Sequence, residues 1–159
     1  MYMKALCHPP EVEARISEFL CFTIYSANLA FGKAYRPILD ELGLTYTQYI
    51  AIITLWEESP QTVGGLGEKL FLEYNTLTPI LKRLETMGYL ERHRDDHDQR
   101  KVLVSITESG RRLREKGLGM SLAAATGLPP DEFAKVQKAI AMLRDNLALA
   151  RRLSRLAPD

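Results

Sequence analysis

Two cysteines and three histidines are the side chains of this sequence that could hold a metal or react with an oxidant. Cys7 and Cys21 match no zinc-site spacing, and His8, His93 and His97 have no ligand spacing, so we expect no metal and no other cofactor. In a reducing compartment such cysteines are more often free thiols than a disulfide. A free thiol can be oxidised, whereas a cysteine on an apolar helix face is usually a small buried hydrophobe. Both interpretations of Cys21 stay open on these grounds.

A second chemical feature is a run of hydrogen-bonding and cationic side chains in residues 73–87. Asn, Thr and Arg side chains can read base edges in the major groove of DNA, and Lys and Thr commonly contact phosphates. The alternative is an ordinary solvated helix face, because polar faces are common on helices. The residues that a DNA-reading helix would present here are Tyr74, Asn75, Thr76, Thr78, Lys82 and Arg83.

A charged loop follows at residues 94–100. Guanidinium groups are drawn to the negative potential of a narrow minor groove, so Arg94 and Arg100 are candidates for a contact there. Asp98 precedes Arg100 by two residues and can hold an arginine side chain by a charge-assisted hydrogen bond, which would fix the shape of the loop. The alternative is a surface ion pair worth about 0–1 kcal/mol without a functional role.

The elements that must position these residues are mostly helices. Pro9-Pro10, followed by acidic residues, predicts a long helix over residues 11–34, and a short separate segment runs from Pro37 to Leu42. Thr45-x-x-Gln48 has the spacing of a capping box and precedes an apolar helix.

The middle of the chain has the pattern of a winged helix-turn-helix. Thr62 can cap a helix from Val63 to Leu70, and a second helix follows over residues 73–87. After it, the hydrophobic period changes from helical to alternating, which predicts two strands at residues 89–92 and 101–106. The expected fold is therefore mainly α with a small β-hairpin wing, and the hairpin favours the DNA-reading interpretation of the helix before it.

The two ends of the chain are helical and rich in apolar positions. A helix is predicted from Thr107 to about Thr126, and a last helix begins at Asp131. The apolar spacing of this last helix is close to that of a heptad seam, which requires a partner helix, and the N-terminal helix also has a broad apolar stripe. We therefore expect a homodimer built from both ends of the chain. The apolar positions of the last helix are Phe133, Val136, Ile140, Leu143, Leu147, Ala150 and Leu153.

Length, composition and charge indicate the class of protein. The chain has 159 residues, of which 46% are hydrophobic and 26% charged, as in a soluble globular protein, and no run is apolar enough for a membrane span or a secretory signal. We expect a cytoplasmic protein. A net charge of +1 means that any nucleic-acid site must arise from uneven charge placement. The predicted regions are an N-terminal arm (1–10), a dimerisation region (11–44 with 107–156) and a DNA-binding region (45–106).

Several runs of the sequence resemble the MarR family of transcriptional regulators, and within it the organic-hydroperoxide-sensing, OhrR-like branch. The resemblance covers most of residues 15–115, and the combination of Cys21 with Tyr35 and Tyr46 is what narrows it to that branch. The matching runs are Leu20-Cys21-Phe22, Tyr35-Arg36-Pro37, Leu42 to Tyr49, Leu55-Trp56-Glu57, Gly67 to Leu72, Thr76 to Glu85 and the wing's Asp98-x-Arg100.

This resemblance implies a repressor that leaves a pseudo-palindromic operator in double-stranded DNA when an organic hydroperoxide oxidises Cys21. It also implies that Tyr35 and Tyr46 donate hydrogen bonds to the Cys21 thiolate, the form that attacks a peroxide, and that the product is a sulfenic acid. Tyr35 lies fourteen residues beyond Cys21. If both lie on one helix, this spacing is about 21 Å, so Tyr35 must serve the Cys21 of the partner subunit.

The sequence departs from many relatives in having no second, resolving cysteine in residues 122–127. Either Cys21 acts alone and its sulfenic acid reacts with a small cellular thiol, or a cysteine has been replaced. Cys7 is a third candidate, although a free thiol near a frayed terminus is the simpler expectation.

Three other functions are compatible with these residues. The nearest is a MarR-type repressor released by a small aromatic ligand, with Cys21 incidental. A thiol peroxidase would need catalytic partners that the sequence does not place near Cys21, so we expect no enzyme. A constitutive architectural DNA binder would ignore oxidants altogether.

Overall fold

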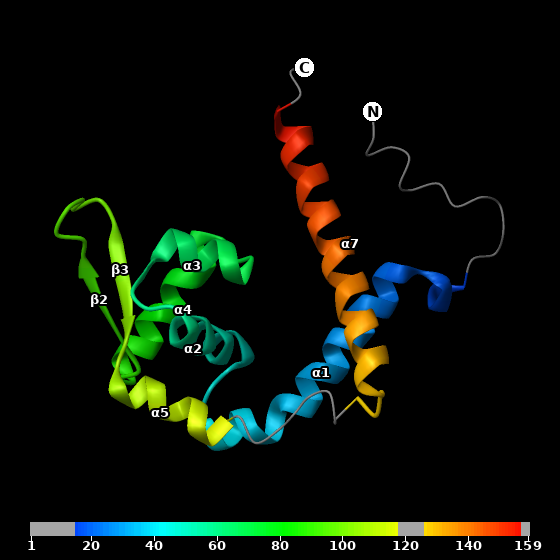
Figure 1. Ribbon diagram of the computed structural model, residues 1–159, viewed down its shortest axis with the longest axis horizontal. Helices are drawn as coiled ribbons and strands as arrows, with labels where there is room; N and C mark the ends of the chain where they lie inside the picture. The colour runs from blue at the N-terminus through cyan, green and yellow to red at the C-terminus, as the bar shows by residue number, and fades with distance from the viewer. Residues whose placement is uncertain (1–14, 118–125, 157–159) are drawn as a thin grey trace. The chain divides into compact units, whose positions relative to one another are not determined.

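The computed structural model describes residues 15–117 and 126–156. The chain forms two compact units, residues 1–117 and 118–159. The first unit begins with a single 3-10 turn, η1 (Ile16–Glu18), followed by the long helix α1 (Leu20–Leu42) and by α2 (Tyr46–Glu57) (Figure 1). The second unit contains α7 (Pro130–Leu156).

The helix α1 differs from the sequence prediction at both ends. It begins at Leu20, because Phe19 has an extended backbone (φ −79°, ψ 116°). The predicted helix over 11–34 is therefore interrupted: Arg15 and Phe19 are extended, and residues 16–18 form only a 3-10 turn; residues 11–14 lie outside the described part of the chain. The predicted break at Pro37 is also wrong, since α1 continues through it to Leu42. Burial of Leu39 in the core offsets the hydrogen bond that a proline removes from a helix.

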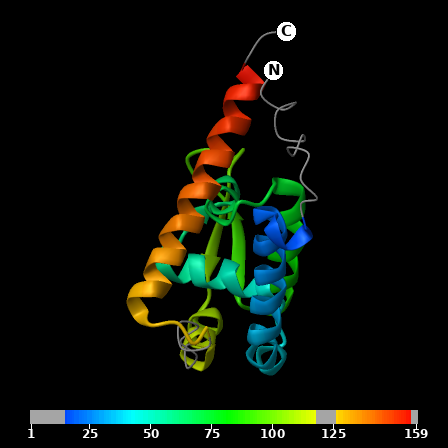
Figure 2. The same ribbon diagram turned by 90° about the vertical axis from the view of Figure 1, so that its right-hand side faces the viewer.

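The helix α2 begins with the predicted capping box and lies at the centre of the first unit. The backbone N–H of Gln48 donates to Thr45 Oγ1 at 3.3 Å, and Thr45 N–H donates to Gln48 Oε1 at 2.9 Å. Ala51, Ile52 and Leu55 are buried in the core. Figure 2 shows α2 crossing the face of the sheet, and this helix also packs against α3, α4 and α5.

The predicted helix-turn-helix is present as α3 (Val63–Leu70) and α4 (Tyr74–Thr86). Thr62 Oγ1 caps α3 by accepting from the Gly65 N–H at 3.0 Å. The turn between the two helices passes close to Gly67, where a Cβ would lie 2.9 Å from the carbonyl oxygen of Leu72, and 3.6 Å from Leu77 Cδ2 on α4. Their inner faces are closed by four leucines with no exposed area, Leu66, Leu77, Leu81 and Leu84.

The sheet has one more strand than the sequence predicted. Its antiparallel order is β1 (Gln61–Thr62), β3 (Val102–Ile106), β2 (Leu90–Arg94), with Leu90 opposite Ile106 and Arg94 opposite Val102. The hairpin β2–β3 is the expected wing. The two-residue strand β1 was missed because it is too short to show alternation.

The helix α5 (Glu108–Gly117) follows the wing and is capped by Thr107. Thr107 Oγ1 accepts from the Gly110 N–H at 3.1 Å and donates to the carbonyl oxygen of Gly88 at 2.7 Å. Residues 118–125, where the sequence predicted that this helix would continue, lie outside the described residues, and Thr126–Gly127 form a turn.

Gly110 allows α5 to lie directly against the start of the wing, so a larger residue at this position should destabilise the fold. A Cβ there would overlap the carbonyl oxygen of Tyr89 and come within 2.8 Å of Ile106 Cγ1. We expect Gly110→Ala to lower the free energy of unfolding by about 1–3 kcal/mol, measured by urea unfolding. The control is Gly64→Ala in α3, where nothing lies within 4 Å of the added Cβ. Equal stability of the two variants would contradict the contact.

The helix α7 begins at Pro130, one residue before the predicted start. Proline suits the first helical position, and Asp131 and Glu132 lie in the first turn, where the helix dipole favours acids. Five of its predicted seam residues are exposed in the single chain: Val136, Ile140, Leu147, Ala150 and Leu153. No helix within the described residues has the length and apolar character needed to cross a membrane.

Candidate functional site

Cys21 is the second residue of α1 and is exposed in the single chain. It lines a hollow together with Ile16, Phe19, Phe22 and Tyr25. The thiol therefore does not fill the core of its own protomer. Because α1 starts later than the sequence predicted, Cys21 lies in the first helical turn, where unpaired backbone N–H groups and the positive end of the helix dipole favour an anion.

Tyr35 and Tyr46 lie together at the junction of α1 with α2. Their ring centroids are 5.0 Å apart with the ring planes tilted by 54°. Tyr49, one turn further along α2, lies 6.2 Å from Tyr35 by the same measure. Tyr35 is half-buried and packs against the core of the first unit, whereas Tyr46 is 43% exposed. The structure thus brings the two predicted thiolate partners into one aromatic cluster.

The ionisation of Tyr35 is shifted by this setting. Burial, and then the neighbouring phenols of Tyr46 and Tyr49, raise the pKa of Tyr35 to about 12. Like any phenol at neutral pH, the Tyr35 hydroxyl keeps its proton and can donate a hydrogen bond, and the shift extends this form to higher pH.

This shift predicts a loss of stability at high pH. Between pH 10 and about 12 the unfolded chain loses the Tyr35 proton while the folded chain keeps it, so stability falls as the pH rises through this window. In an absorbance titration at a tyrosinate wavelength, we expect one of the seven tyrosines to ionise near pH 12. That late step should be missing in Tyr35→Phe. If the two titrations coincide, Tyr35 is not the shifted group.

Cys21 and the tyrosine cluster do not meet within one chain. Both Cys21 and Tyr35 lie on the uninterrupted helix α1. Their separation of fourteen residues corresponds to about 21 Å of helix, well beyond hydrogen-bond reach. One protomer therefore carries two halves of the predicted sensor at the two ends of one helix.

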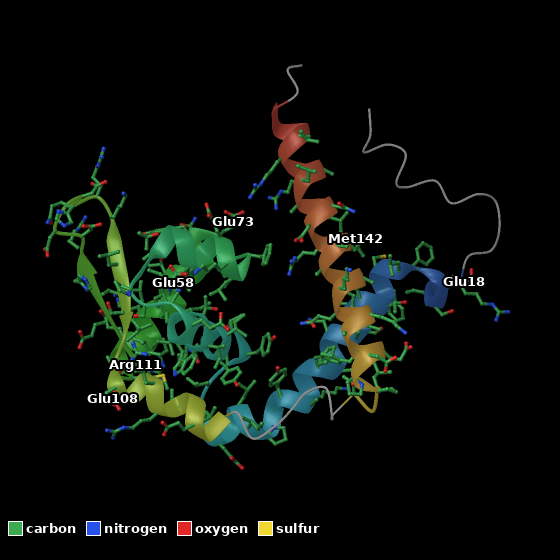
Figure 3. All side chains as sticks on the ribbon, in the orientation of Figure 1. Glu18, Glu58, Glu73, Glu108, Arg111 and Met142 are labelled. Atoms are coloured by element: carbon green, nitrogen blue, oxygen red, sulfur yellow. The ribbon has the colours of Figure 1, made fainter. Side chains whose placement is uncertain are left out.

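The polar face of α4 is open to solvent. Tyr74, Asn75 and Thr76 in the first turn are exposed, as are Lys82 and Arg83. Thr78 is half-buried, and its hydroxyl donates to the carbonyl oxygen of Tyr74 at 2.8 Å. Figure 3 shows Glu73, the N-cap residue of α4, well away from Glu108 and Arg111 of α5.

The loop of the wing is held by the predicted bond between Arg100 and Asp98 and by a second bond, from Arg94, that was not predicted. Arg100 Nε donates to Asp98 Oδ1 at 3.1 Å, and this interaction lowers the pKa of Asp98. The Arg100 side chain is nevertheless 92% exposed, so Asp98 orients it without burying it. Arg94 Nη1 donates to the carbonyl oxygen of Gln99 at 2.7 Å and closes the loop from the other strand.

One contact between α4 and the wing was not predicted. Arg92 on β2 donates to Glu85 on α4 through Nε at 3.0 Å, Nη2 at 2.5 Å and the backbone N–H at 3.2 Å. The hydrogen bonds from Arg92 lower the pKa of Glu85. The pair fixes the angle between the helix and the wing, but in sequence it looks like any two opposite charges on either side of a turn.

Comparison with known proteins identifies the architecture. The family model described as transcriptional regulator SarA/Rot matches residues 33–116, more than half of the chain. The chain belongs to the SarA/Rot family. The expected winged helix of the MarR type is therefore confirmed, and this SarA/Rot protein is a transcriptional regulator.

The relatives of this SarA/Rot regulator include one that is named for organic hydroperoxide resistance. It is 44% identical over 104 residues to the organic hydroperoxide resistance transcriptional regulator of Bacillus subtilis, covering 65% of this chain and 71% of that protein. It is 43% identical over 130 residues to the regulator TtmR of Methylorubrum extorquens, covering 80% and 67% of the two chains.

Solved structures of related regulators have the same fold as this chain. One of them is the structure of reduced AbfR, a protein of Staphylococcus epidermidis, bound to DNA. It matches this chain with a TM-score of 0.71 at 34% identity, and the match covers 93% of this chain and 99% of that chain. Apo MarR from E. coli matches with a TM-score of 0.64 at 25% identity and covers 79% and 96%. AbfR bound to DNA has also been solved in an overoxidised form.

Proposed function

We propose that this regulator is a homodimeric repressor that binds a pseudo-palindromic operator and releases it when an organic hydroperoxide oxidises Cys21. The observation that carries the proposal is the placement of Tyr35 and Tyr46 in one cluster, with the exposed Cys21 a helix length away on α1. These two halves can form a complete sensor only between two chains. The name of the B. subtilis relative supports the same class of inducer.

The dimer is formed, in this proposal, by the helical regions 11–44 and 107–156. Apolar side chains that the single chain leaves open lie on both: Ile16, Leu20, Leu29 and Phe31 near or on α1, and Val136, Ile140, Leu147 and Leu153 on α7. Burying side chains of this kind stabilises a dimer by about 25 cal/mol for each Å² removed from water.

The redox step is a two-electron oxidation of sulfur. The Cys21 thiolate attacks the hydroperoxide, an S–O bond forms as the O–O bond breaks, and the alkoxide leaves as an alcohol after taking up a proton. The product is a sulfenic acid on Cys21. A small cellular thiol then condenses with it to give a mixed disulfide and water. The first-turn position of Cys21 and phenol donors from the partner subunit both stabilise the thiolate.

The response reaches DNA through α2. Tyr46 is the first residue of α2, and this helix packs against α3 and α4. Oxidised sulfur loses its phenol partners, so the junction of α1 with α2 repacks and moves the region 45–106. The two recognition helices then no longer fit successive major grooves, which lie about 34 Å apart.

DNA is read by α4 and the wing in this proposal. Tyr74, Asn75, Thr76 and Thr78 face the bases and sugars of the major groove, while Lys82 and Arg83 contact phosphates. Arg94 and the Asp98-held Arg100 reach the adjacent minor groove. The protein works in the cytoplasm, and the arm 1–10 has no assigned part.

The test is a binding titration with an operator fragment selected from random DNA by the reduced protein, at one stated salt concentration. Cumene hydroperoxide should weaken binding at least about tenfold, which corresponds to about 1.4 kcal/mol, and salicylate should leave it unchanged. Release by salicylate and not by the hydroperoxide would favour the small-aromatic-ligand function instead.

A further inference from the structure

Tyr49 is a third aromatic residue near the proposed sensor; it lies in the run Leu42 to Tyr49 that resembles the family, but the resemblance assigned it no role. It lies on α2, three residues after Tyr46, with its ring 6.2 Å from that of Tyr35 and tilted by 51°. Tyr49 is half-buried and packs against the core of the first unit, as Tyr35 does. Within the described residues, Tyr35 therefore has two aromatic ring neighbours, and both lie on α2.

The two neighbours differ in how firmly they can hold Tyr35. Tyr46 is 43% exposed and occupies the first position of α2, so its own ring is only partly fixed. Tyr49 is one turn inside the helix and touches the core, so its ring is the better fixed of the two. Aromatic pairs at such centroid distances contribute about 0.5–1.5 kcal/mol beyond the area that they bury.

A phenol that stabilises a thiolate must place its hydroxyl within about 3 Å of the sulfur. Displacement of a positioning group by about 1 Å can slow a reaction by about two orders of magnitude. The orientation of the Tyr35 ring on α1 is thus set by the aromatic side chains of α2 that pack against it.

We propose that Tyr49 is a positioning residue of the redox sensor, which holds the Tyr35 ring so that its hydroxyl meets the Cys21 sulfur of the partner subunit. Tyr49 itself does not touch the sulfur. This inference rests on the proposed redox function of Cys21 and Tyr35.

The electrostatics of the cluster are consistent with this role. After burial and the phenol of Tyr46, the Tyr49 phenol is the third cause of the raised pKa of Tyr35. This agrees with the 6.2 Å that separates the ring centroids of Tyr35 and Tyr49.

The test is the rate of Cys21 oxidation by cumene hydroperoxide in the full-length reduced dimer, followed by trapping the sulfenic acid with dimedone at several pH values. Tyr49→Leu should lower the second-order rate constant about tenfold and move the pH at half-maximal rate upward. Tyr49→Phe, which keeps the ring, should react within about twofold of wild type. Both variants should bind the operator normally when reduced.

Two further variants distinguish a specific role of Tyr49 from a general loss of core packing. Tyr89→Leu removes another half-buried tyrosine that packs on the same core but is not one of the ring neighbours of Tyr35, and it should not slow oxidation. Tyr49→Met fills the space with a flexible side chain, and we expect it to slow oxidation as Tyr49→Leu does. It replaces Tyr49→Leu in the test if the leucine variant does not bind the operator when reduced.

The possible failures can be told apart through Tyr35→Phe. If Tyr35→Phe slows oxidation but Tyr49→Leu and Tyr49→Met do not, the positioning role of Tyr49 is overturned and the proposed sensor stands. If Tyr35→Phe also has the wild-type rate and pH profile, the sensor itself is overturned, and the role of Tyr49 with it.

Discussion

Cys21→Ser should bind the operator as tightly as the wild-type protein and should no longer release it when an organic hydroperoxide is added. A serine hydroxyl is close in size to a thiol but is not oxidised, so the reduced dimer is preserved and the switch is lost. We expect wild-type affinity to fall at least about tenfold after oxidation, and the affinity of the serine variant to change by less than about twofold. Fluorescence anisotropy of a labelled operator measures both.

The matched control for this experiment is Cys7→Ser. The sequence has two cysteines, so replacement of Cys7 leaves Cys21 as the only thiol. Full release of this variant by hydroperoxide would show that Cys21 acts without a second cysteine of the chain. Release of Cys21→Ser at the wild-type hydroperoxide concentration would instead mean that the sensor lies elsewhere.

The winged helix was predictable because its signals are local. Thr45 with Gln48 and Thr62 before α3 are capping residues whose side chains bond within one turn, and both caps are present. The change from helical to alternating hydrophobic spacing placed β2 and β3 to within a residue or two at their ends. Such patterns depend on neighbours in sequence, so no knowledge of distant contacts was needed.

The errors in the predicted secondary structure arose where contacts between residues distant in sequence determine the fold. The helix α1 passes Pro37 because Leu39 is buried against residues far along the chain, which local propensity does not reveal. The strand β1 exists through its pairing with β3, with Gln61 opposite Val104, although two residues show no alternation. The buried Gln61 amide also donates to the carbonyl oxygen of Thr54 at 3.0 Å, a contact that only the folded chain defines.

The candidate site shows the same division. Cys21, Tyr35 and Tyr46 were selected by their resemblance to a family pattern, whereas periodicity alone would have left Cys21 as a buried hydrophobe. The contact of Tyr35 with Tyr49, and the Glu85–Arg92 contact between α4 and the wing, depend on packing between elements, and the sequence predicted neither contact. The one geometric statement that the sequence did allow was the separation of Cys21 from Tyr35 along a helix.

Because Cys21 and Tyr35 are separated along α1, two defective chains should restore fast Cys21 oxidation when they form a mixed dimer. In a heterodimer of Cys21→Ser with Tyr35→Phe, the intact Cys21 comes from one chain and the intact Tyr35 from the other. If Tyr35 serves the sulfur of the partner subunit, this heterodimer contains one complete sensor and one doubly defective one. We expect its single Cys21 to be oxidised at close to the wild-type rate, whereas the Tyr35→Phe homodimer should react at least about tenfold more slowly.

The heterodimer can be purified with two different affinity tags, and dimedone labelling of the tagged Tyr35→Phe chain reports the rate. If Tyr35 instead acted within its own chain, the Cys21 in this heterodimer would lack its phenol donor and would react as slowly as in the Tyr35→Phe homodimer. Rescue therefore requires the sensor to lie between subunits. Because Tyr35 and Tyr46 pack at the start of α2, a sensor between subunits also ties the N-terminus of one α1 to the DNA-reading helices of the other chain, so oxidation of a single sulfur changes how two protomers are held together.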